Sequence, residues 1–376
     1  MNILIATDKF KDALPADAVC QALKEGILRS FPSAQIETLP LADGGEGTLE
    51  VLHRVLGGTF VQVRVQDPLG RPVEASYLWW PESRSAVIEM ARASGLELLA
   101  PGERNCLITS SYGTGELIAH ALGQGLRHLT LTVGGTATND GGMGMAAALG
   151  YRFLDAAGNE LAPIGQNLGL VARIDSSARH PALAGLQAKV ATDVSAPFYG
   201  PEGAAQVYAP QKGADAAGVA LLDAGLEHFA DCLHSAFSQQ VQQIPGSGAG
   251  GGMGGGAVCF LNAGIRSAAG WVLELCAVPE KLAAADLLIT GEGKSDAQST
   301  QGKLISHLLT LAGDVGKPAI LVCGTLSDTD ALLQYPALRY AVSILDRPLS
   351  LTEAIAETQP LLVQQGRWLG RWLSRN

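Results

Sequence analysis

Aromatic residues make up only 5% of this 376-residue sequence and charged residues only 16%, and the 26 basic residues are outnumbered by 36 acidic ones. The net charge of -10 argues against a surface for nucleic acid or an anionic membrane, because both need a positive patch. No window offers about 20 predominantly apolar residues, so we expect no transmembrane helix. The N-terminus, MNILIATDKF, lacks the pattern of a secretory signal, and we therefore expect a cytoplasmic protein.

The six cysteines form neither a CxxC pair nor the Cys and His spacing of a zinc site. They stand singly inside apolar stretches, which is typical of small core residues in a reduced compartment. The HExxH motif of zinc peptidases is absent as well. The pattern argues against a disulfide scaffold and against a zinc enzyme.

Hydrophobic residues are abundant at 47%, and the length is sufficient for two domains. Residues 2–30 and 35–56 each combine a short apolar run, a polar loop and an amphipathic segment, which predicts strand–loop–helix units of an α/β fold. Residues 60–90 interrupt this alternation with three short runs that predict an antiparallel meander. We therefore expect a domain boundary near this segment.

The compositional anomaly of the chain is the glycine run GSGAGGGMGGG at residues 246–256. Glycine loses much conformational entropy on folding and buries no side chain, so the run indicates either a disordered linker or a close approach to the main chain. It stands between structured segments in a chain without Ser/Pro-rich linkers, which favours the second interpretation. Gly246, Gly248 and Gly251 fit the GxGxxG dinucleotide pattern, but no strand-like run precedes them. A run this rich in glycine also contains the pattern by chance.

Acidic residues follow five expected strands, in several cases beside glycine, at residues 8–12, 43–47, 139–142, 193 and 291–296. Loops after parallel strands gather at the carboxyl edge of a sheet. There, glycine lets main-chain N–H groups approach an oxyanion and carboxylates hold a divalent ion, a combination that suits phosphoryl transfer. The GKS at 293–295 is not a P-loop, because Leu288 stands where that motif needs its first glycine.

These segments also have purely structural interpretations. DGGEG at 43–47 can be a turn and a helix start, and Asp193 can form an Asx turn before Pro197. TATNDGG at 136–142 is harder to explain as a turn, because it concentrates hydroxyl, amide and carboxylate groups between a strand and a helix. Its side chains can bind a ligand or a metal ion while its glycines expose the backbone.

Nine motifs follow one another in this order along the chain: DKFK, PLADGGEGT, IEMARASGL, SYGTGEL, GGTATNDGGMGM, ATDVSAPFYGPEGA, APQKGA, the glycine run and TGEGKSDAQSTQGK. Together they resemble the bacterial class I glycerate kinase family over nearly the whole sequence. The sequence departs from that pattern at Asp12-Ala13, at Cys106 and at Ser195-Ala196, where the family has Gly-Ser, Pro and Asn-Pro. The resemblance implies an ATP-dependent, magnesium-requiring kinase that phosphorylates D-glycerate, with 2-phosphoglycerate as the expected product.

The same resemblance implies a two-domain α/β protein. A Rossmann-like domain would be formed by both ends of the chain, residues 1–75 plus 285–376. A second α/β domain, residues 76–284, would be inserted between them and would contain the TATNDGG and glycine-rich loops. The acidic composition is compatible with a homodimer as well as with a monomer.

Phosphoryl transfer depends mainly on positioning and charge stabilisation, and a carboxylate within hydrogen-bond reach can take the proton of the acceptor hydroxyl. We expect Asp193 to be this base, with Asp8 or Asp43 in reserve, and Lys11 to contact a phosphate or carboxylate group. The expected substrate-binding residues are Asp43, Glu46, Arg64, Arg71 and Arg92. The expected nucleotide-binding residues are Thr136, Thr138, Asn139, Gly248, Gly251, Gly252, Gly291 and Lys294. The expected magnesium ligands are Asp140, Glu292 and Asp296.

Other functions stay open at this point. The kinase could act on a related hydroxy acid or yield 3-phosphoglycerate, and a binding or regulatory protein on this scaffold would keep the glycines without turning over ATP. A nicotinamide-dependent oxidoreductase would need a strand before Gly246 and an acidic residue about 20 positions after the motif begins. Instead, QVQQIP precedes the run, and the nearest acidic residue after it is Glu274.

Overall fold

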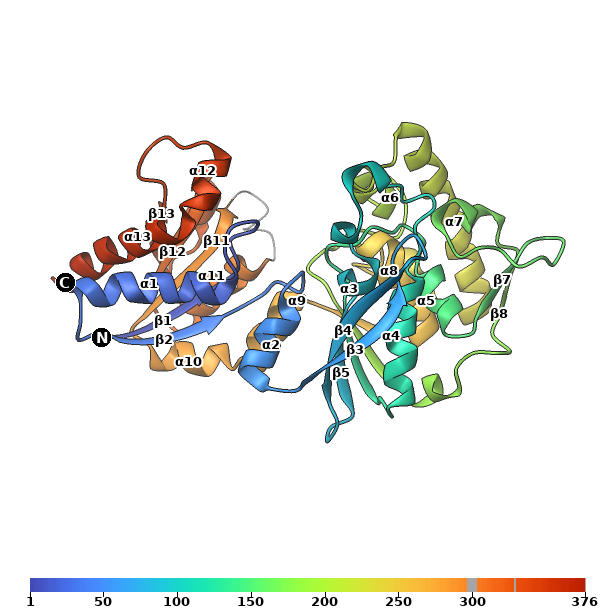
Figure 1. The fold of residues 1–376 in the computed structure, drawn as a ribbon, viewed down its shortest axis with the longest axis horizontal. Helices are drawn as coiled ribbons and strands as arrows, with labels where there is room; N and C mark the ends of the chain where they lie inside the picture. The colour runs from blue at the N-terminus through green and yellow to red at the C-terminus, as the bar shows by residue number, and fades with distance from the viewer. Residues whose placement is uncertain (296–302, 328, 376) are drawn as a thin grey trace. The chain divides into compact units, whose positions relative to one another are not determined.

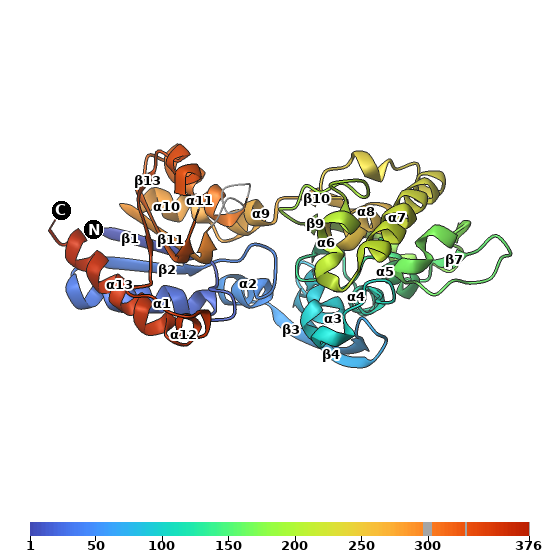
Figure 2. The same cartoon turned by 90° about the horizontal axis from the view of Figure 1, so that it is seen from above.

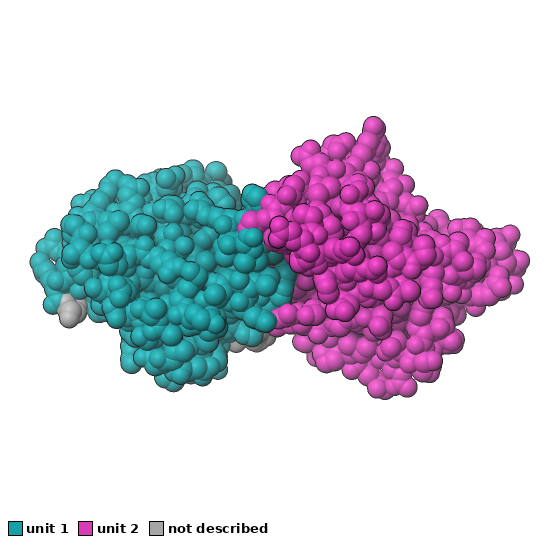
Figure 3. All heavy atoms as spheres, turned by 90° about the horizontal axis from the view of Figure 1, so that it is seen from below, with its two compact units in different colours: residues 1–43, 50–56, 269–376 teal, residues 44–49, 57–268 magenta. Residues whose placement is uncertain are grey.

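The structure is a computed structural model that describes residues 1–295, 303–327 and 329–375. The chain divides into two compact units, which Figure 3 colours separately. Unit 1 comprises residues 1–43, 50–56 and 269–376, and unit 2 comprises residues 44–49 and 57–268. The boundaries expected from the sequence differ from this division: residue 75 lies inside strand β4 (Pro72–Trp80), which pairs with β3 (Thr59–Gln66) and with β5 (Ser85–Glu89), all of unit 2.

Unit 1 is built on a five-stranded parallel sheet (Figure 1). Its strands are β1 (Asn2–Thr7), β2 (Gln35–Pro40), β11 (Leu287–Ser295), β12 (Ala319–Leu326) and β13 (Leu338–Ser343). The spatial order β13-β12-β11-β1-β2 places the two N-terminal strands beside the three C-terminal ones. In such a sheet the winding direction reverses between β1 and β11, and the loops after strands at such a point are a common place for a binding site.

Helices α1 (Ala16–Ser30) and α13 (Thr358–Leu373) lie side by side on one face of this sheet (Figures 1 and 2). Their apolar residues share a core with Ile3, Ile289 and Val322. The two helices cross closely, since a Cβ on Gly26 would lie 2.1 Å from the carbonyl oxygen of Val363. The side chains that point to the other face of the sheet are buried too, and they include Leu4, Leu288 and Leu321. Burial on both faces explains the nearly continuous apolar runs of these strands.

The other helices that contribute to unit 1 are α2 (Thr48–Leu56), α9 (Ala268–Leu275), α10 (Val278–Ala284), α11 (Leu304–Asp314) and α12 (Leu351–Ala356). Helices α2 and α9 each begin with residues of unit 2. Within the described ranges, no helix is long and apolar enough to cross a membrane.

Strand β11 extends further than the sequence predicts. A loop was expected from residue 291 onward, but the strand runs to Ser295 and pairs with β12 through Gly291 and Glu292. The apolar run ends at Thr290, so the polar half of the strand carries no hydrophobic signal. The sheet itself requires Gly291, because a Cβ there would lie 2.2 Å from the carbonyl oxygen of Val322.

Unit 2 is built on a six-stranded mixed sheet in the order β10-β9-β6-β5-β4-β3. Its strands are β3 (Thr59–Gln66), β4 (Pro72–Trp80), β5 (Ser85–Glu89), β6 (His128–Thr132), β9 (Gln187–Ala191) and β10 (Gly264–Arg266). The first three pair antiparallel, which confirms the predicted meander. The last four are parallel, so their carboxyl ends share one edge.

The helices of unit 2 are α3 (Ala91–Ser94), α4 (Tyr112–Gly123), α5 (Met143–Ala148), α6 (Ala204–Tyr208), α7 (Ala216–Phe237) and α8 (Ala249–Leu261). Helix α8 begins inside the glycine run and lies beside β9 and β10 (Figure 2). A short hairpin of β7 (Arg152–Leu154) and β8 (Arg173–Asp175) was not predicted. All six cysteines of the chain are free and five are buried, as expected for packing residues.

Candidate active site

Four strand ends of unit 2 bring most of the expected site residues to one edge. Glu89, Thr132, Ala191 and Arg266 are in register across β5, β6, β9 and β10, and each is the last residue of its strand. The segments that follow these strands must therefore begin side by side at this edge. They carry Arg92, the loop 136–142, Asp193 and Ser267.

Asp193 lies two residues beyond β9 and is half-buried. Its Oδ1 accepts a hydrogen bond from Ser267 Oγ at 2.7 Å. The N–H of Thr192 donates to the carbonyl oxygen of Arg266 at 3.0 Å, so the segments after β9 and β10 are tied together. Ser267 was not a candidate from the sequence, because it belongs to no motif and its neighbour β10 is too short to give a strand signal.

Arg92 is the one of the three candidate arginines that follows a strand at this edge. Its Nε donates to Glu89 Oε2 at 2.8 Å. The Glu89 side chain is almost fully buried, and its Oε1 accepts the N–H of Leu49 at 2.8 Å. The buried carboxylate thus fixes the guanidinium at the edge. Glu46 approaches the same edge, because a Cβ on Gly135 would lie 2.7 Å from Glu46 Oε1.

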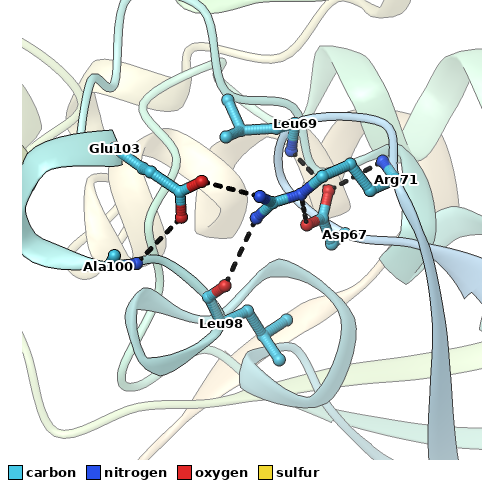
Figure 4. A network of polar contacts seen from close by, with 6 residues as sticks. All are labelled: Asp67, Leu69, Arg71, Leu98, Ala100 and Glu103. Atoms are coloured by element: carbon cyan, nitrogen blue, oxygen red, sulfur yellow. Dashed lines mark hydrogen bonds and ion pairs between the residues drawn. The ribbon is translucent and has the colours of Figure 1, made fainter.

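Arg64 and Arg71 lie elsewhere in unit 2. Arg64 is exposed on β3, the outermost strand of the sheet. The guanidinium of Arg71 donates from Nε to Asp67 Oδ2 at 2.6 Å and from Nη1 to Glu103 Oε1 at 2.7 Å (Figure 4). The hydrogen bond from Arg71 also lowers the pKa of Glu103. These contacts favour a structural role for Arg71 over the substrate contact that the sequence suggested.

Asp140 is fully buried at the start of α5, and four donors surround its carboxylate. Oδ2 accepts from the N–H and the hydroxyl of Ser111, both at 2.7 Å, and from the N–H of Gly144 at 3.1 Å. Oδ1 accepts from the N–H of Gly142 at 3.1 Å. Burial raises the pKa of Asp140, and these hydrogen bonds oppose the rise. The donors favour a structural carboxylate that joins the starts of α4 and α5 over the expected magnesium ligand.

Thr136, Thr138 and Asn139 are buried in the same loop, directly after β6. The Nζ of Lys212 donates to the carbonyl oxygen of Thr138 at 2.7 Å and to Thr136 Oγ1 at 3.3 Å. Burial lowers the pKa of Lys212 to about 8. Lys212 belongs to the APQKGA motif, but it lies more than 70 residues beyond the loop in sequence, at separations of 74 and 76, so nothing local revealed this contact.

Some buried polar atoms of this region have no hydrogen-bond partner among the residues that the structure describes. They are Thr138 Oγ1, both polar side-chain atoms of Asn139 and Ser247 Oγ. Buried polar groups are normally satisfied, so such atoms indicate places where an ordered water or a ligand group completes the network. This observation fits a ligand-binding role for Thr138 and Asn139.

The glycine run packs between the loops that follow β6 and β9. A Cβ on Gly251 would lie 2.1 Å from the carbonyl oxygen of Thr138, and one on Gly248 would lie 2.1 Å from that of Pro197. The backbone is left-handed from Gly250 to Gly252, with φ of 62°, 72° and 89°. The run is therefore an ordered spacer and not a linker. The nucleotide-binding role expected for Gly248, Gly251 and Gly252 stays a prediction.

Unit 1 gathers the other candidates where the winding of its sheet reverses. Asp8 follows β1, and its N–H donates to the carbonyl oxygen of Gly291 at 2.9 Å. The pKa of Asp8 is raised well above its ordinary value, first by burial and then by the negative charges of Asp43 and Glu292. Asp8 is thus close enough to Asp43 and to Glu292 for their charges to act on it, which is a setting that a divalent cation relieves.

Among the residues described, no three His, Cys, Asp or Glu side chains are already arranged to hold a metal ion. Asp296, an expected magnesium ligand, lies outside the described residues. Lys11 is exposed after β1, and its backbone nitrogen would lie 3.1 Å from a Cβ on Gly293. Lys294 is exposed near the end of β11. The five acidic segments, which are expected from the sequence to share the edge of one sheet, thus follow strands of two different sheets.

Comparisons with known proteins extend over the whole chain. A sequence model described as the glycerate kinase family matches residues 3–374. A glycerate kinase of Halalkalibacterium halodurans is 40% identical over 366 residues, which cover 97% of this chain and 96% of that protein. The glycerate 2-kinase of Escherichia coli K12 is 40% identical over 354 residues, covering 94% and 93%.

A solved structure gives the same result for the fold. It is a crystal structure from Salmonella typhimurium LT2, provisionally described as glycerate kinase 2. The two chains share a TM-score of 0.86 and 39% sequence identity, and the match covers 100% of this chain and 98% of the other. The similarity confirms the mixed α/β fold that the sequence predicts.

Proposed function

Because the chain belongs to the glycerate kinase family, we propose that it transfers the γ-phosphoryl group of ATP to a hydroxyl group of D-glycerate. The observation that carries this proposal is the edge of unit 2, where Asp193 and Arg92 follow the parallel strands on either side of β6, and the loop after β6 contains unsatisfied buried groups. The proposed product is 2-phosphoglycerate, since one relative is named glycerate 2-kinase. The proposed location is the cytoplasm.

In this proposal Asp193 is the base that takes the proton of the acceptor hydroxyl. A hydroxyl must lose its proton as its oxygen attacks phosphorus, and a carboxylate within hydrogen-bond reach can accept it. Ser267 fixes the carboxylate of Asp193 by donating to Oδ1. Such a fixed orientation matters because the attack requires an in-line approach of oxygen to phosphorus.

Arg92 is proposed to bind the carboxylate group of glycerate. A guanidinium offers paired N–H donors that match a carboxylate, and the ion pair with buried Glu89 holds Arg92 in place. The loop from Thr136 to Asn139 is proposed to bind the nucleotide through its hydroxyl and amide groups.

We propose that carboxylates of unit 1 hold magnesium. The charges of Asp43 and Glu292 both raise the pKa of Asp8, so these two carboxylates lie near Asp8, and carboxylate oxygens are the ligands that magnesium prefers. When bound, a magnesium ion neutralises part of the phosphate charge. Cations of this chain would stabilise the rest of the phosphate charge, and Lys11 and Lys294 are the candidates.

An assay of ADP release tests the proposed function. It compares D-glycerate with L-glycerate, tartronate and glycerol as acceptors, with and without excess chelator, and phosphorus NMR identifies the phosphorylated hydroxyl. We expect release with D-glycerate and magnesium only, and a product phosphorylated at C2. If none of these acceptors supports ADP release, the chain is not a kinase of this class and the binding-protein alternative takes its place.

Replacing Ser267 with Ala is expected to lower kcat by roughly tenfold to a hundredfold, because a hydrogen bond to a charged group contributes about 1.5–3 kcal/mol. Ser267→Thr keeps the hydroxyl and should restore kcat. A Ser267→Ala enzyme that turns over at the wild-type rate would show that this contact does not position the base.

A further inference from the structure

Lys212 is a buried cation that the proposed mechanism does not use. The residue is 3% exposed. Removing an ammonium group from water is costly unless hydrogen bonds and an opposite charge compensate. The compensation comes from the loop after β6: the carbonyl oxygen of Thr138 and the hydroxyl of Thr136 accept from Nζ, and the buried carboxylate of Asp140 supplies the opposite charge.

The direction of the Lys212 side chain is imposed by its backbone. The N–H of Cys106 donates to the carbonyl oxygen of Lys212 at 3.1 Å. Gly213 follows with a φ of 92°, and a Cβ there would lie 1.9 Å from the carbonyl oxygen of Arg104. The chain after Lys212 is therefore pinned against residues 104–106. The side chain of Lys212 therefore extends toward the loop after β6 from a backbone position that is held in place.

The contact with Thr136 determines what its hydroxyl can do. Because Thr136 Oγ1 accepts from Nζ, the hydroxyl's own hydrogen must be donated to another acceptor. A hydroxyl that accepts from an ammonium group is polarised and becomes a stronger donor. Thr136 directly follows exposed Gly134 and Gly135, at the margin of the loop. An anionic oxygen is the acceptor that suits such a donor best.

We propose that Lys212 is a positioning residue for nucleotide binding, which holds Thr136 and the main chain of Thr138 so that the loop can donate to phosphate oxygens. This inference rests on the proposed function, because it assigns the nucleotide to that loop. The polar side-chain atoms of Thr138 and Asn139, which have no hydrogen-bond partner among the described residues, would then provide further contacts to the nucleotide.

The test replaces Lys212 with Met, which keeps the length of the side chain and removes its charge and donors. We expect the KM for ATP and the Kd for ATP, measured by calorimetry without glycerate, to rise by roughly tenfold to thirtyfold. The KM for D-glycerate and kcat should change by less than about threefold. Lys189→Met removes an exposed lysine of β9 and should leave all four values unchanged.

Thermal unfolding separates this role from a purely structural one. Lys212→Met leaves the buried carboxylate of Asp140 without its opposite charge, and removing one member of a buried charge pair is destabilising, so the Tm should fall and ATP binding is measured well below it. A lower Tm combined with unchanged ATP affinity would overturn the proposal. Thr136→Val provides a second variant with little change in shape: it should weaken ATP binding alone, and the effect should largely vanish in the Lys212→Met background.

The outcomes also separate this inference from the function on which it rests. If the wild type binds ATP and phosphorylates D-glycerate while Lys212→Met and Thr136→Val bind ATP equally well, the inference is wrong and the kinase assignment stands. If the wild type binds no ATP under any condition, the proposed function and the inference both fail.

Discussion

Replacing Asp193 with Asn is expected to lower kcat by about a hundredfold to ten-thousandfold, because the amide cannot accept the proton of the substrate hydroxyl. The KM for ATP should change by less than about threefold, since the substitution keeps the size of the side chain and Asp193 lies after β9 rather than in the loop assigned to the nucleotide. Steady-state kinetics with each substrate varied in turn gives both values.

A matched control removes the same charge elsewhere in unit 2. Asp231 is exposed on α7, and Asp231→Asn should keep wild-type kinetics. If Asp193→Asn turned over at the wild-type rate, the base would have to be another group. Asp8→Asn and Asp43→Asn would then be the variants to compare, since both carboxylates follow strands of unit 1.

The sequence predicts those parts of the fold that depend on local patterns. Short, partly apolar segments located β1, β6 and β9, and alternation located the meander of β3 to β5. Strand β10 has three residues and the polar half of β11 has no apolar signal, so neither could be located. The periodicity of each segment also carries no information about which sheet its strand joins. The acidic segments could therefore not be assigned to two sheets.

The positions of candidate residues were predictable where these residues follow strands that the sequence reveals. Asp193 and Arg92 belong to this group, and their roles stay predictions. Partners that arrive from distant segments were not predictable: Ser111 bonds to Asp140 across 29 residues of sequence, and Ser267 bonds to Asp193 across 74. A local motif also cannot tell whether a carboxylate binds a ligand or accepts hydrogen bonds at the starts of two helices, and the four donors around Asp140 were not visible in the motif.

Replacing Gly251 with Val is expected to lower the free energy of unfolding by about 2–5 kcal/mol. The left-handed backbone costs an L-residue roughly 1–2 kcal/mol, and forcing extra atoms into a packed site adds about 1–3 kcal/mol. The clash is with backbone, at 2.1 Å from the carbonyl oxygen of Thr138, so no side-chain rotation relieves it. Urea denaturation measures the loss, which is a large part of a typical total of about 5–15 kcal/mol.

Gly264→Val is the control for this prediction, because Gly264 is exposed, has no positive φ, and a Cβ there would meet nothing within 4 Å. Valine also suits its place in β10, so stability should be unchanged or slightly higher. The smaller Gly251→Ala separates the two interpretations of the glycine run. If the run serves as a spacer, ATP affinity should fall only as far as stability falls, and it should recover under conditions that keep the variant folded. If Gly251→Ala is as stable as the wild type but binds ATP more weakly, the glycine is required by the nucleotide and not by the carbonyl group of Thr138.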